Sequence, residues 1–310
     1  LSRSDSMMAG KIKNISISVH ERLRNMAGES SRPFNELLQH FAIERFIYRL
    51  SKSPYADRFI LKGALMFLAW SGPASRPTMD IDLLGKIDNS IEKIEMVMKQ
   101  ACNMDVEEDG MIFHDHTVSA ARITEDAEYE GTRVRIKGNL GKARVSLQID
   151  IGFGDVVVPD PGRVAYPVLL EFPPPELNGY TMESTIAEKY QAMVKLGILN
   201  SRMKDFYDIW LLSHTFDFDG EVLAEAVNRT FKNRKTDLNT EPAVFDPSFG
   251  KDSAKQAQWQ AFVKKTRLSN APGEFNAVLT DMKMFLGPLI TSLVDRQPFH
   301  GKWKASGPWI

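Results

Sequence analysis

Cysteine is almost absent from this chain, which has only Cys102 among its 310 residues. A single cysteine excludes an internal disulfide framework and indicates a reducing compartment. No neighbouring feature marks its thiol as activated, so we expect a small buried hydrophobic side chain. The chain also lacks an apolar run of the eighteen or so residues of a membrane span and the apolar core of a signal peptide. We therefore expect a soluble cytoplasmic protein that makes no contact with a membrane.

An excess of charge of one sign is missing as well. The formal net charge is −1, so the overall charge does not predict nucleic-acid binding, although a local basic patch would be enough for it. Hydrophobic residues make up 43% of the chain and charged residues 25%, which is typical of a globular protein with a substantial core. A length of 310 residues is sufficient for two domains.

Hydrophobic periodicity predicts a first half that mixes helices and strands. Helical spacing covers residues 16–53, with a break near 28–33, and residues 64–70 and 90–103. Strand patterns cover residues 59–61, 78–84, 117–123, 132–137 and 143–151. The last run alternates apolar and polar residues and indicates a half-buried strand that ends near Asp150.

A proline-rich passage at residues 159–175 marks the predicted change of domain, and the pattern beyond it is almost wholly helical. Thr185 and Glu188 have the spacing of a capping box, which predicts a helix start there. Further helices are predicted over 202–214, 221–235, 253–268 and 273–295, with an exposed or loosely docked tail at 303–309. The fold class is α+β: a mixed sheet with flanking helices over 11–165, then a mainly helical domain over 166–310.

Asp80-Ile81-Asp82 is the most informative motif, because strand spacing projects both carboxylates from one face. Like charges so close favour a cation between them, and Mg²⁺ is usually held by one or two carboxylates plus substrate phosphates. Asp150 supplies a third carboxylate on another strand, as a base or a third ligand. Two metal ions about 3.5–4 Å apart would hold the oxygens of an in-line displacement. The alternative interpretation is a solvated strand face or a turn.

Lys62-Gly63 precedes this motif at a predicted strand-to-helix turn, where backbone N–H groups can receive phosphate oxygens. Thr78 lies two residues before Asp80, so alternation would put its hydroxyl on the carboxylate face, although a β-branched strand former is the simpler interpretation. Arg76 in the preceding loop is either a triphosphate contact or an ordinary solvated arginine.

Gly63, Asp80-Ile81-Asp82 and Asp150 together resemble the core of the polymerase-beta-type nucleotidyltransferase superfamily. More narrowly, the chain resembles the AbiEii/AbiGii toxin family, the toxin halves of type IV toxin–antitoxin pairs. The resemblance runs from about residue 17 to 235. It rests on four ordered blocks: Ile60-Leu-Lys-Gly-Ala-Leu, Arg76-Pro-Thr-Met-Asp-Ile-Asp-Leu, Ala187-Glu-Lys-Tyr-Gln-Ala-Met and Arg202-Met-Lys-Asp-Phe-Tyr-Asp-Ile.

The resemblance implies a Mg²⁺-dependent transfer, with two ions, of a nucleoside monophosphate from a nucleoside triphosphate. It implies that Lys189 contacts triphosphate and that Asp205 or Asp208 completes the site, with Asp205 preferred. It also implies an RNA acceptor, such as a tRNA end, and a cognate antitoxin. From the residues alone, Lys189 could be a surface lysine, and the two aspartates could belong to a helix N-terminal turn.

Ala64 departs from the superfamily, whose turn usually carries Gly-Gly or Gly-Ser, so a side-chain hydroxyl is missing there. A nucleotide-binding regulator without turnover is therefore one alternative, and an antitoxin-binding interaction protein is another. His114 and His116 lack further metal ligands nearby and are read as ordinary histidines. Two basic groups, which are as typical of solvated helix faces, could contact RNA phosphates: Arg229, Lys232, Arg234, Lys235 and Lys264, Lys265, Arg267.

Overall fold

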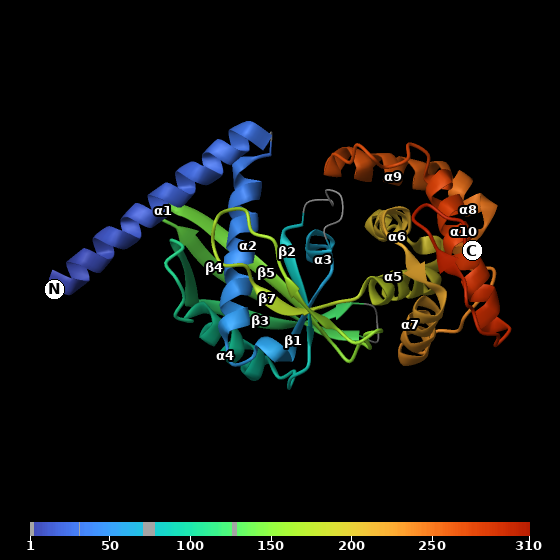
Figure 1. The fold of residues 1–310 in the computed structure, drawn as a ribbon, viewed down its shortest axis with the longest axis horizontal. Helices are drawn as coiled ribbons and strands as arrows, with labels where there is room; N and C mark the ends of the chain where they lie inside the picture. Colours follow the sequence, from blue (N-terminus) through green and yellow to red (C-terminus); the bar gives the residue numbers. More distant parts are fainter. Residues whose placement is uncertain (1–2, 31, 71–77, 126–128) are drawn as a thin grey trace. The chain divides into compact units, whose positions relative to one another are not determined.

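The computed structural model describes residues 3–30, 32–70, 78–125 and 129–310, with side chains in these ranges except at 3–14, 124–125 and 129–130. The chain divides into two compact units, most of whose helices and strands are labelled in Figure 1. The first unit is made of Leu1–Ser71, Pro77–Gly154 and Gly162–Gly179. The second unit consists mainly of Asp155–Pro161 and Tyr180–Ile310.

A seven-stranded mixed sheet forms the centre of the first unit, in the order β3-β4-β5-β2-β1-β7-β6. Strand β2 is parallel to β5 and β1 is parallel to β7, whereas the other neighbours are antiparallel. The strands are β1 (Phe59–Lys62), β2 (Asp80–Gly85), β3 (Met111–Glu125), β4 (Tyr129–Leu140), β5 (Ala143–Phe153), β6 (Gly162–Ala165) and β7 (Glu176–Gly179). The helices are α1 (Arg3–Ser30), α2 (Phe34–Lys52), α3 (Leu65–Ala69) and α4 (Ile91–Cys102), with a 3-10 turn at Ala56–Arg58.

One face of this sheet is apolar because side chains alternate along each strand. In β5, Val145 and Leu147 are buried, while Ser146 between them is exposed. Helix α2 packs against β5 and α4, and α4 packs against β3. The buried face of α4, which includes Val97 and Ala101, completes the core on that side. The opposite face of the sheet is left for polar side chains.

Helix α2 carries two buried arginines that share one buried carboxylate. Arg49 donates two hydrogen bonds to Asp109, of 2.6 and 2.9 Å, and Arg45 donates a third of 3.1 Å. The backbone N–H of Met111, the first residue of β3, also donates to Asp109 at 2.9 Å. Buried charges are tolerated only when they are paired and hydrogen-bonded, so this group fixes α2 against the start of β3.

The second unit is mainly helical. Its helices are α5 (Met182–Leu196), α6 (Met203–Thr215), α7 (Gly220–Asn233), α8 (Pro247–Lys251), α9 (Ser253–Thr266) and α10 (Phe275–Val294), with 3-10 turns at Gly197–Leu199 and Ala243–Phe245 and short paired strands β8 (Phe218–Asp219) and β9 (Lys302–Trp303). The predicted two-domain division at residues 165 and 166 stays a prediction. The first unit's sheet includes β7, which follows that point.

Three sequence predictions need correction. Strand β6 lies in the proline-rich passage and β7 directly follows it, and these short segments gave no strand pattern. Helix α5 begins at Met182 rather than Thr185, because the hydroxyl of Thr181 accepts a 3.2 Å hydrogen bond from the N–H of Ser184. The C-terminal tail is packed rather than loose: Trp303 is 1% exposed, and its indole donates to the carbonyl of Ser213 at 2.7 Å.

Helix α10 is long and apolar enough to cross a membrane by length and composition alone. The expectation that no segment is long and apolar enough to span a membrane is therefore wrong for α10, by length and composition. Eight of the helix's side chains, among them Phe285 and Leu289, are buried inside the second unit, as in the core helix of a folded domain. Cys102 is buried at the end of α4, and burial raises the pKa of its thiol to about 12, as expected for an inert hydrophobic position.

Glu44 is a fully buried carboxyl on α2. Burial raises its pKa to about 8, and the raised value persists although the N–H of Leu169 and the charge of Arg45 oppose it. The N–H of Leu169 donates a 2.9 Å hydrogen bond to one Glu44 oxygen, while the other oxygen has no hydrogen-bond partner among the described residues. Glu44 is therefore protonated in the folded protein at neutral pH.

Replacing Glu44 with glutamine should make the stability of the protein less dependent on pH. The folded pKa of about 8 lies above the ordinary value of 4.5, so the stabilisation that Glu44 gives is complete below 4.5 and is lost as pH rises through 8. The wild type should lose up to about 5 kcal/mol relative to Glu44→Gln over this range, at about 1.4 kcal/mol per pKa unit. Urea unfolding of both proteins at pH 5.5 and 8 measures this; an equal pH dependence would contradict it.

Candidate active site

The three aspartates predicted as the acidic site, Asp80, Asp82 and Asp150, lie on neighbouring strands of one sheet. In the parallel pairing of β2 with β5, Asp82 lies opposite Asp150 and Asp80 lies opposite Gln148. Side chains that are paired in register project from the same face. Ile81 and Leu83, which alternate with the aspartates, are fully buried on the other face. The strand spacing that the sequence predicted is therefore present, and the carboxylates emerge on the polar face.

Gly63 lies directly against Asp82. Its φ of +71° falls in the left-handed region, and a Cβ atom built on it would lie 2.0 Å from Oδ2 of Asp82. Any side chain at this position would be both strained and in collision with the carboxylate. Lys62, the residue before it, pairs in register with Asp82 across β1 and β2. The turn therefore brings a cationic residue and a bare backbone up to the acidic strand.

Asp150 has a partner that sequence reasoning missed. Arg133 on β4 donates two hydrogen bonds to its carboxylate, of 2.8 and 2.7 Å, and Gln148 donates a longer one of 3.4 Å. The antiparallel register of β4 with β5 sets Arg133 opposite Asp150. The sequence does not suggest this pair, because the two residues are 17 positions apart along the chain. The register of the β4–β5 hairpin brings them together. Arg133 compensates one of the three negative charges.

No three His, Cys, Asp or Glu side chains come together as a ready-made metal site within the described parts of the chain. His114 and His116 belong to no such group. Both lie in β3 beside a register shift, and His114 makes a 2.7 Å hydrogen bond with Asn139. Any cation at the acidic site would therefore need donors beyond protein carboxylates, such as phosphate oxygens of a substrate.

The remaining predicted residues of the first unit are placed as follows. Ala64 is the N-cap of α3 and makes no side-chain capping bond. Thr78 precedes β2, which begins at Asp80 rather than at residue 78, and its hydroxyl donates a 3.3 Å hydrogen bond to the carbonyl of Asp80. The prediction that strand alternation carries this hydroxyl to the carboxylate face is therefore wrong. Arg76 lies outside the described residues.

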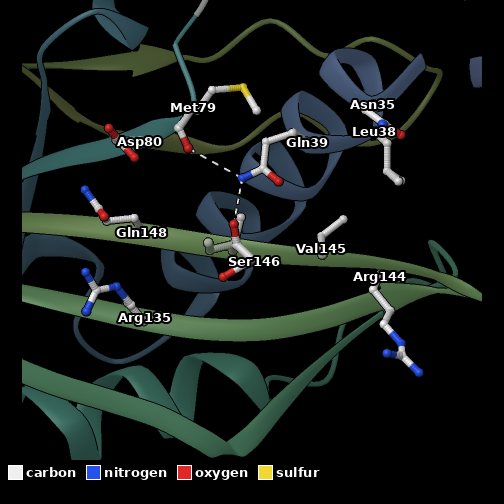
Figure 2. A pocket seen from close by; sticks show the side chains of 11 residues that line it. Asn35, Leu38, Gln39, Met79, Asp80, Arg135, Arg144, Val145, Ser146 and Gln148 are labelled. Atoms are coloured by element: carbon white, nitrogen blue, oxygen red, sulfur yellow. Dashed lines mark hydrogen bonds between the residues drawn. The ribbon is translucent and has the colours of Figure 1, made fainter. Parts of the chain in front are cut away.

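A pocket of about 450 Å³ opens beside Asp80 (Figure 2). Gln39 of α2 closes one side, because its amide donates hydrogen bonds to the carbonyls of Ser146, at 2.9 Å, and Met79, at 3.4 Å. These bonds join β5 to the segment just before β2, where the strand pairing ends. The other lining residues are Asn35, Leu38, Arg135, Arg144, Val145, Leu147 and Gln148.

A second set of predicted residues forms an ion cluster within the second unit. The ammonium group of Lys189 on α5 lies 2.7 Å from Asp205 and 2.8 Å from Asp208, both on α6. Arg202 lies 2.7 Å from the other oxygen of Asp205. The side chains of Asp205 and Asp208 are 1% and 3% exposed, and that of Lys189 is 14% exposed. We call these four residues the helical ion cluster.

The electrostatics of this cluster favour the charged form of Asp205. Burial alone raises the pKa of Asp205, but the charges of Lys189 and Arg202 outweigh it and lower that pKa below its ordinary value of 3.8. Lys189 bridges both aspartates, whereas Arg202 forms an ion pair with Asp205. The interpretation of Lys189 as a solvated surface lysine is therefore wrong. Asp205 does lie in the first turn of α6, as the alternative interpretation expected, but both carboxylates are also buried and paired with Lys189.

Arg234, which the sequence offered as a phosphate contact, is engaged elsewhere. Its guanidinium donates hydrogen bonds to Asp155, the shorter of 2.8 Å, and to Gln191 at 3.1 Å, and lies 3.4 Å from Glu188. Tyr180 donates to the same Glu188 carboxylate. This network uses the charge of Arg234 inside the second unit, so the expectation for this residue is not supported. Lys232 and Lys235 beside it are exposed.

Comparison with known families places the chain in a class. Residues 45–281 match the family described as nucleotidyl transferase AbiEii toxin, type IV TA system. The match covers well over half of the 310 residues. The protein is therefore a nucleotidyltransferase. It belongs to the AbiEii toxin family of type IV toxin–antitoxin systems.

No curated protein matches the chain. Among solved structures, JHP933 from Helicobacter pylori is 14% identical, with a TM-score of 0.44, over 84% of this chain and 93% of that one. A second H. pylori protein, described as a presumed nucleotidyltransferase, is 13% identical with a TM-score of 0.42 over 86% and 97% of the two chains. At this level of likeness, neither bears on the fold or the site.

Substituting alanine for Gly63 should damage the acidic site. The new Cβ would collide with the carboxylate of Asp82 at a φ that disfavours L-residues, so we expect a loss of about 1–3 kcal/mol in the free energy of unfolding. Urea denaturation measures it. Gly162→Ala is the matched control, because a Cβ atom there meets nothing within 4 Å. Equal stabilities of the two variants would show that the turn readily moves away from Asp82.

Removing the cation of the helical ion cluster should be costly. Lys189→Ala leaves two buried carboxylates facing each other with Arg202 as the remaining described partner of Asp205, and we expect about 3–5 kcal/mol of destabilisation. The exposed Lys195 on the same helix supplies the control Lys195→Ala. Thermal and urea unfolding of both variants decide the matter. A cost below about 1 kcal/mol, typical of exposed ion pairs, would contradict it.

Proposed function

We propose that this enzyme transfers a nucleoside monophosphate from a nucleoside triphosphate to a hydroxyl group of RNA, such as a tRNA end, with Mg²⁺ bound at Asp80 and Asp82. The family supports the transferase class. The observation that carries the proposal is the strand register that faces Asp82 with Asp150, beside a glycine turn that lies against Asp82.

The residues present fit a magnesium site of the kind that substrate completes. Two aspartates on one strand face, with no further ligand cluster in the described chain, match the usual preference of Mg²⁺ for one or two carboxylates plus phosphate oxygens. Bound there, one or two ions would neutralise charge on the attacking and leaving oxygens. For Asp150 to serve as a third ligand, its carboxylate would have to share its oxygens with Arg133.

Asp150 is better placed as the base. In the transfer, the acceptor oxygen forms a bond to the α-phosphorus of the triphosphate while the bond to the leaving pyrophosphate breaks. The proton of the acceptor hydroxyl passes to a carboxylate oxygen of Asp150. The two hydrogen bonds from Arg133 hold that carboxylate in a fixed orientation beside Asp82. Orientation of this kind is a large part of what such enzymes contribute to phosphoryl transfer.

The turn at Lys62, Gly63 and Ala64 would hold the triphosphate in the first unit, and Lys189 in the second unit stays a separate proposal for phosphate contact. Gly63 exposes its backbone, and Ala64 begins α3 without a capping side chain, so main-chain N–H groups are the donors that this turn offers. We assign Asp205 and Asp208 the role of positioning Lys189, since both lie within 2.8 Å of its ammonium group. Arg76 and Thr78 stay secondary proposals for phosphate contact.

The family implies two partners, a nucleoside triphosphate and a cognate antitoxin protein. We also propose that the acceptor is RNA, that the protein is cytoplasmic, and that the chain divides into a polymerase-beta-like domain and a helical domain. The presence of Ala64 does not argue for a regulator without turnover, because the turn's contribution is made by the backbone.

Asp80→Asn should abolish transfer. Removing one of two carboxylates that hold the cation is expected to lower the rate at least about 10²-fold, the scale of losing a main electrostatic stabiliser. The assay incubates wild type and variant with Mg²⁺, total tRNA and each labelled nucleoside triphosphate in turn, and measures label in RNA. Asp105→Asn, at an exposed position, is the matched control.

Two further arms make this assay decisive. Omitting Mg²⁺ and adding EDTA should remove wild-type incorporation, and restoring the ion should recover it. Undiminished incorporation by Asp80→Asn, with the variant folded like wild type, would show that the chemistry lies elsewhere.

A further inference from the structure

The polar face of β4 and β5 carries a row of basic side chains that the proposed function has not used. The antiparallel register sets Arg135 opposite Gln148, Lys137 opposite Ser146 and Asn139 opposite Arg144. These residues therefore share the face from which Asp150 projects. Between them, Val134, Ile136 and Leu147 are buried on the other side of the sheet. Arg135, Lys137 and Arg144 are exposed.

Two adjoining pockets are lined by residues of this face. The pocket of Figure 2 is lined by Arg135 and Arg144 and has Asp80 at one end. A second pocket of about 850 Å³ is lined by Lys137, Lys142 and Arg144, together with His114. The pockets share Arg144, Val145 and Ser146, so they adjoin each other at the first half of β5. We call the two together the basic groove.

The charge of the basic groove is strongly one-sided. Asp80 is the only carboxylate among its described lining residues, against four cations: Arg135, Lys137, Lys142 and Arg144. Within the described chain none of these four forms an ion pair, in contrast to Arg133, which is bound to Asp150. The whole chain has a net charge of −1, so this excess is local. A concentrated row of uncompensated cations fits a polyanion.

We propose that the basic groove binds the sugar–phosphate backbone of a single-stranded RNA end and leads its terminal hydroxyl to the acidic site; this inference rests on the proposed function. From Gln148 to Lys142 the groove follows six residues of strand and turn, roughly 20 Å at about 3.3 Å per residue, which accommodates a few nucleotides. The reaction would occur at the acidic end of the groove, beside Asp80. The cations lie along the rest of the groove, where they would contact the phosphates of the RNA strand.

The occupant is a nucleic acid strand rather than a protein for two reasons. The four cations extend along one line that begins at the carboxylate proposed to hold the catalytic metal, so a ligand in the groove continues into the reaction site. Charged side chains set along a groove track a phosphate backbone without requiring a particular sequence. An acidic antitoxin segment is the competing occupant, and the experiment below separates the two.

The test is RNA binding by the double variant Arg135→Gln/Arg144→Gln. Fluorescence anisotropy of a labelled single-stranded 20-nucleotide RNA of mixed sequence, over a salt series, gives affinity and salt dependence. Loss of two phosphate contacts should weaken binding about 25-fold at 0.1 M salt and reduce the slope of log K against log salt by about 1.4, since each single-strand contact contributes about 0.7. The double variant Lys86→Gln/Lys251→Gln removes two exposed charges elsewhere and should bind RNA like wild type.

Each other outcome overturns the inference. No RNA binding by wild type, or equal affinity and slope for wild type and the groove variant, would refute the groove. Weakened binding of the cognate antitoxin with unchanged RNA affinity would assign the surface to that protein instead. Failure of the proposed function gives a different result. If Asp80→Asn still incorporates label, the proposed chemistry is refuted. If Asp80→Asn loses incorporation but the groove variant keeps the wild-type KM for RNA, only the groove is refuted.

Discussion

Mutual repulsion of three aspartates on one face of a sheet is the constraint on which the acidic site depends. Asp82 and Asp150 face each other across a parallel strand pair, and Asp80 follows on the same side. Like charges directly opposite one another destabilise a sheet. Neighbouring cationic residues reduce this repulsion: Arg133 binds Asp150, and Lys62 pairs in register with Asp82. A cation from solution, together with substrate phosphates, would complete the compensation at Asp80 and Asp82.

The sequence predicted the local part of this arrangement well. Alternation in β2 and β5 is a period-two signal, so the common face of Asp80 and Asp82 follows from the residues themselves. The longer helices of the second unit, α5, α6, α7, α9 and α10, were found within a few residues by their apolar spacing, whereas the short α8 was missed. Strands β6 and β7 were missed because each has only four residues, in or just after the proline-rich passage. They are held by pairing, β7 with β1 and β6 with β7, rather than by a pattern of their own.

The partners of the site residues could not be predicted, because they depend on register and on helix packing. Arg133 reaches Asp150 only after the hairpin of β4 and β5 has fixed which residues are opposite. Likewise, a lysine on α5 and two aspartates on α6 meet only when their helices are packed. An ammonium group that is buried and paired twice has lost its rotamer freedom, so its position within the second unit is fixed.

The pairing of Asp150 with Arg133 also bears on how the chemistry divides among the carboxylates. A carboxylate that already accepts two hydrogen bonds from a guanidinium is a poorer partner for a metal ion, because both its oxygens and its charge are in use. It can still receive a proton, since each oxygen retains a further lone pair. In the strand register Asp80 and Asp82 lie opposite Gln148, Asp150 and Lys62. Cation binding at β2 and proton transfer at β5 is therefore the division that the neighbouring side chains favour.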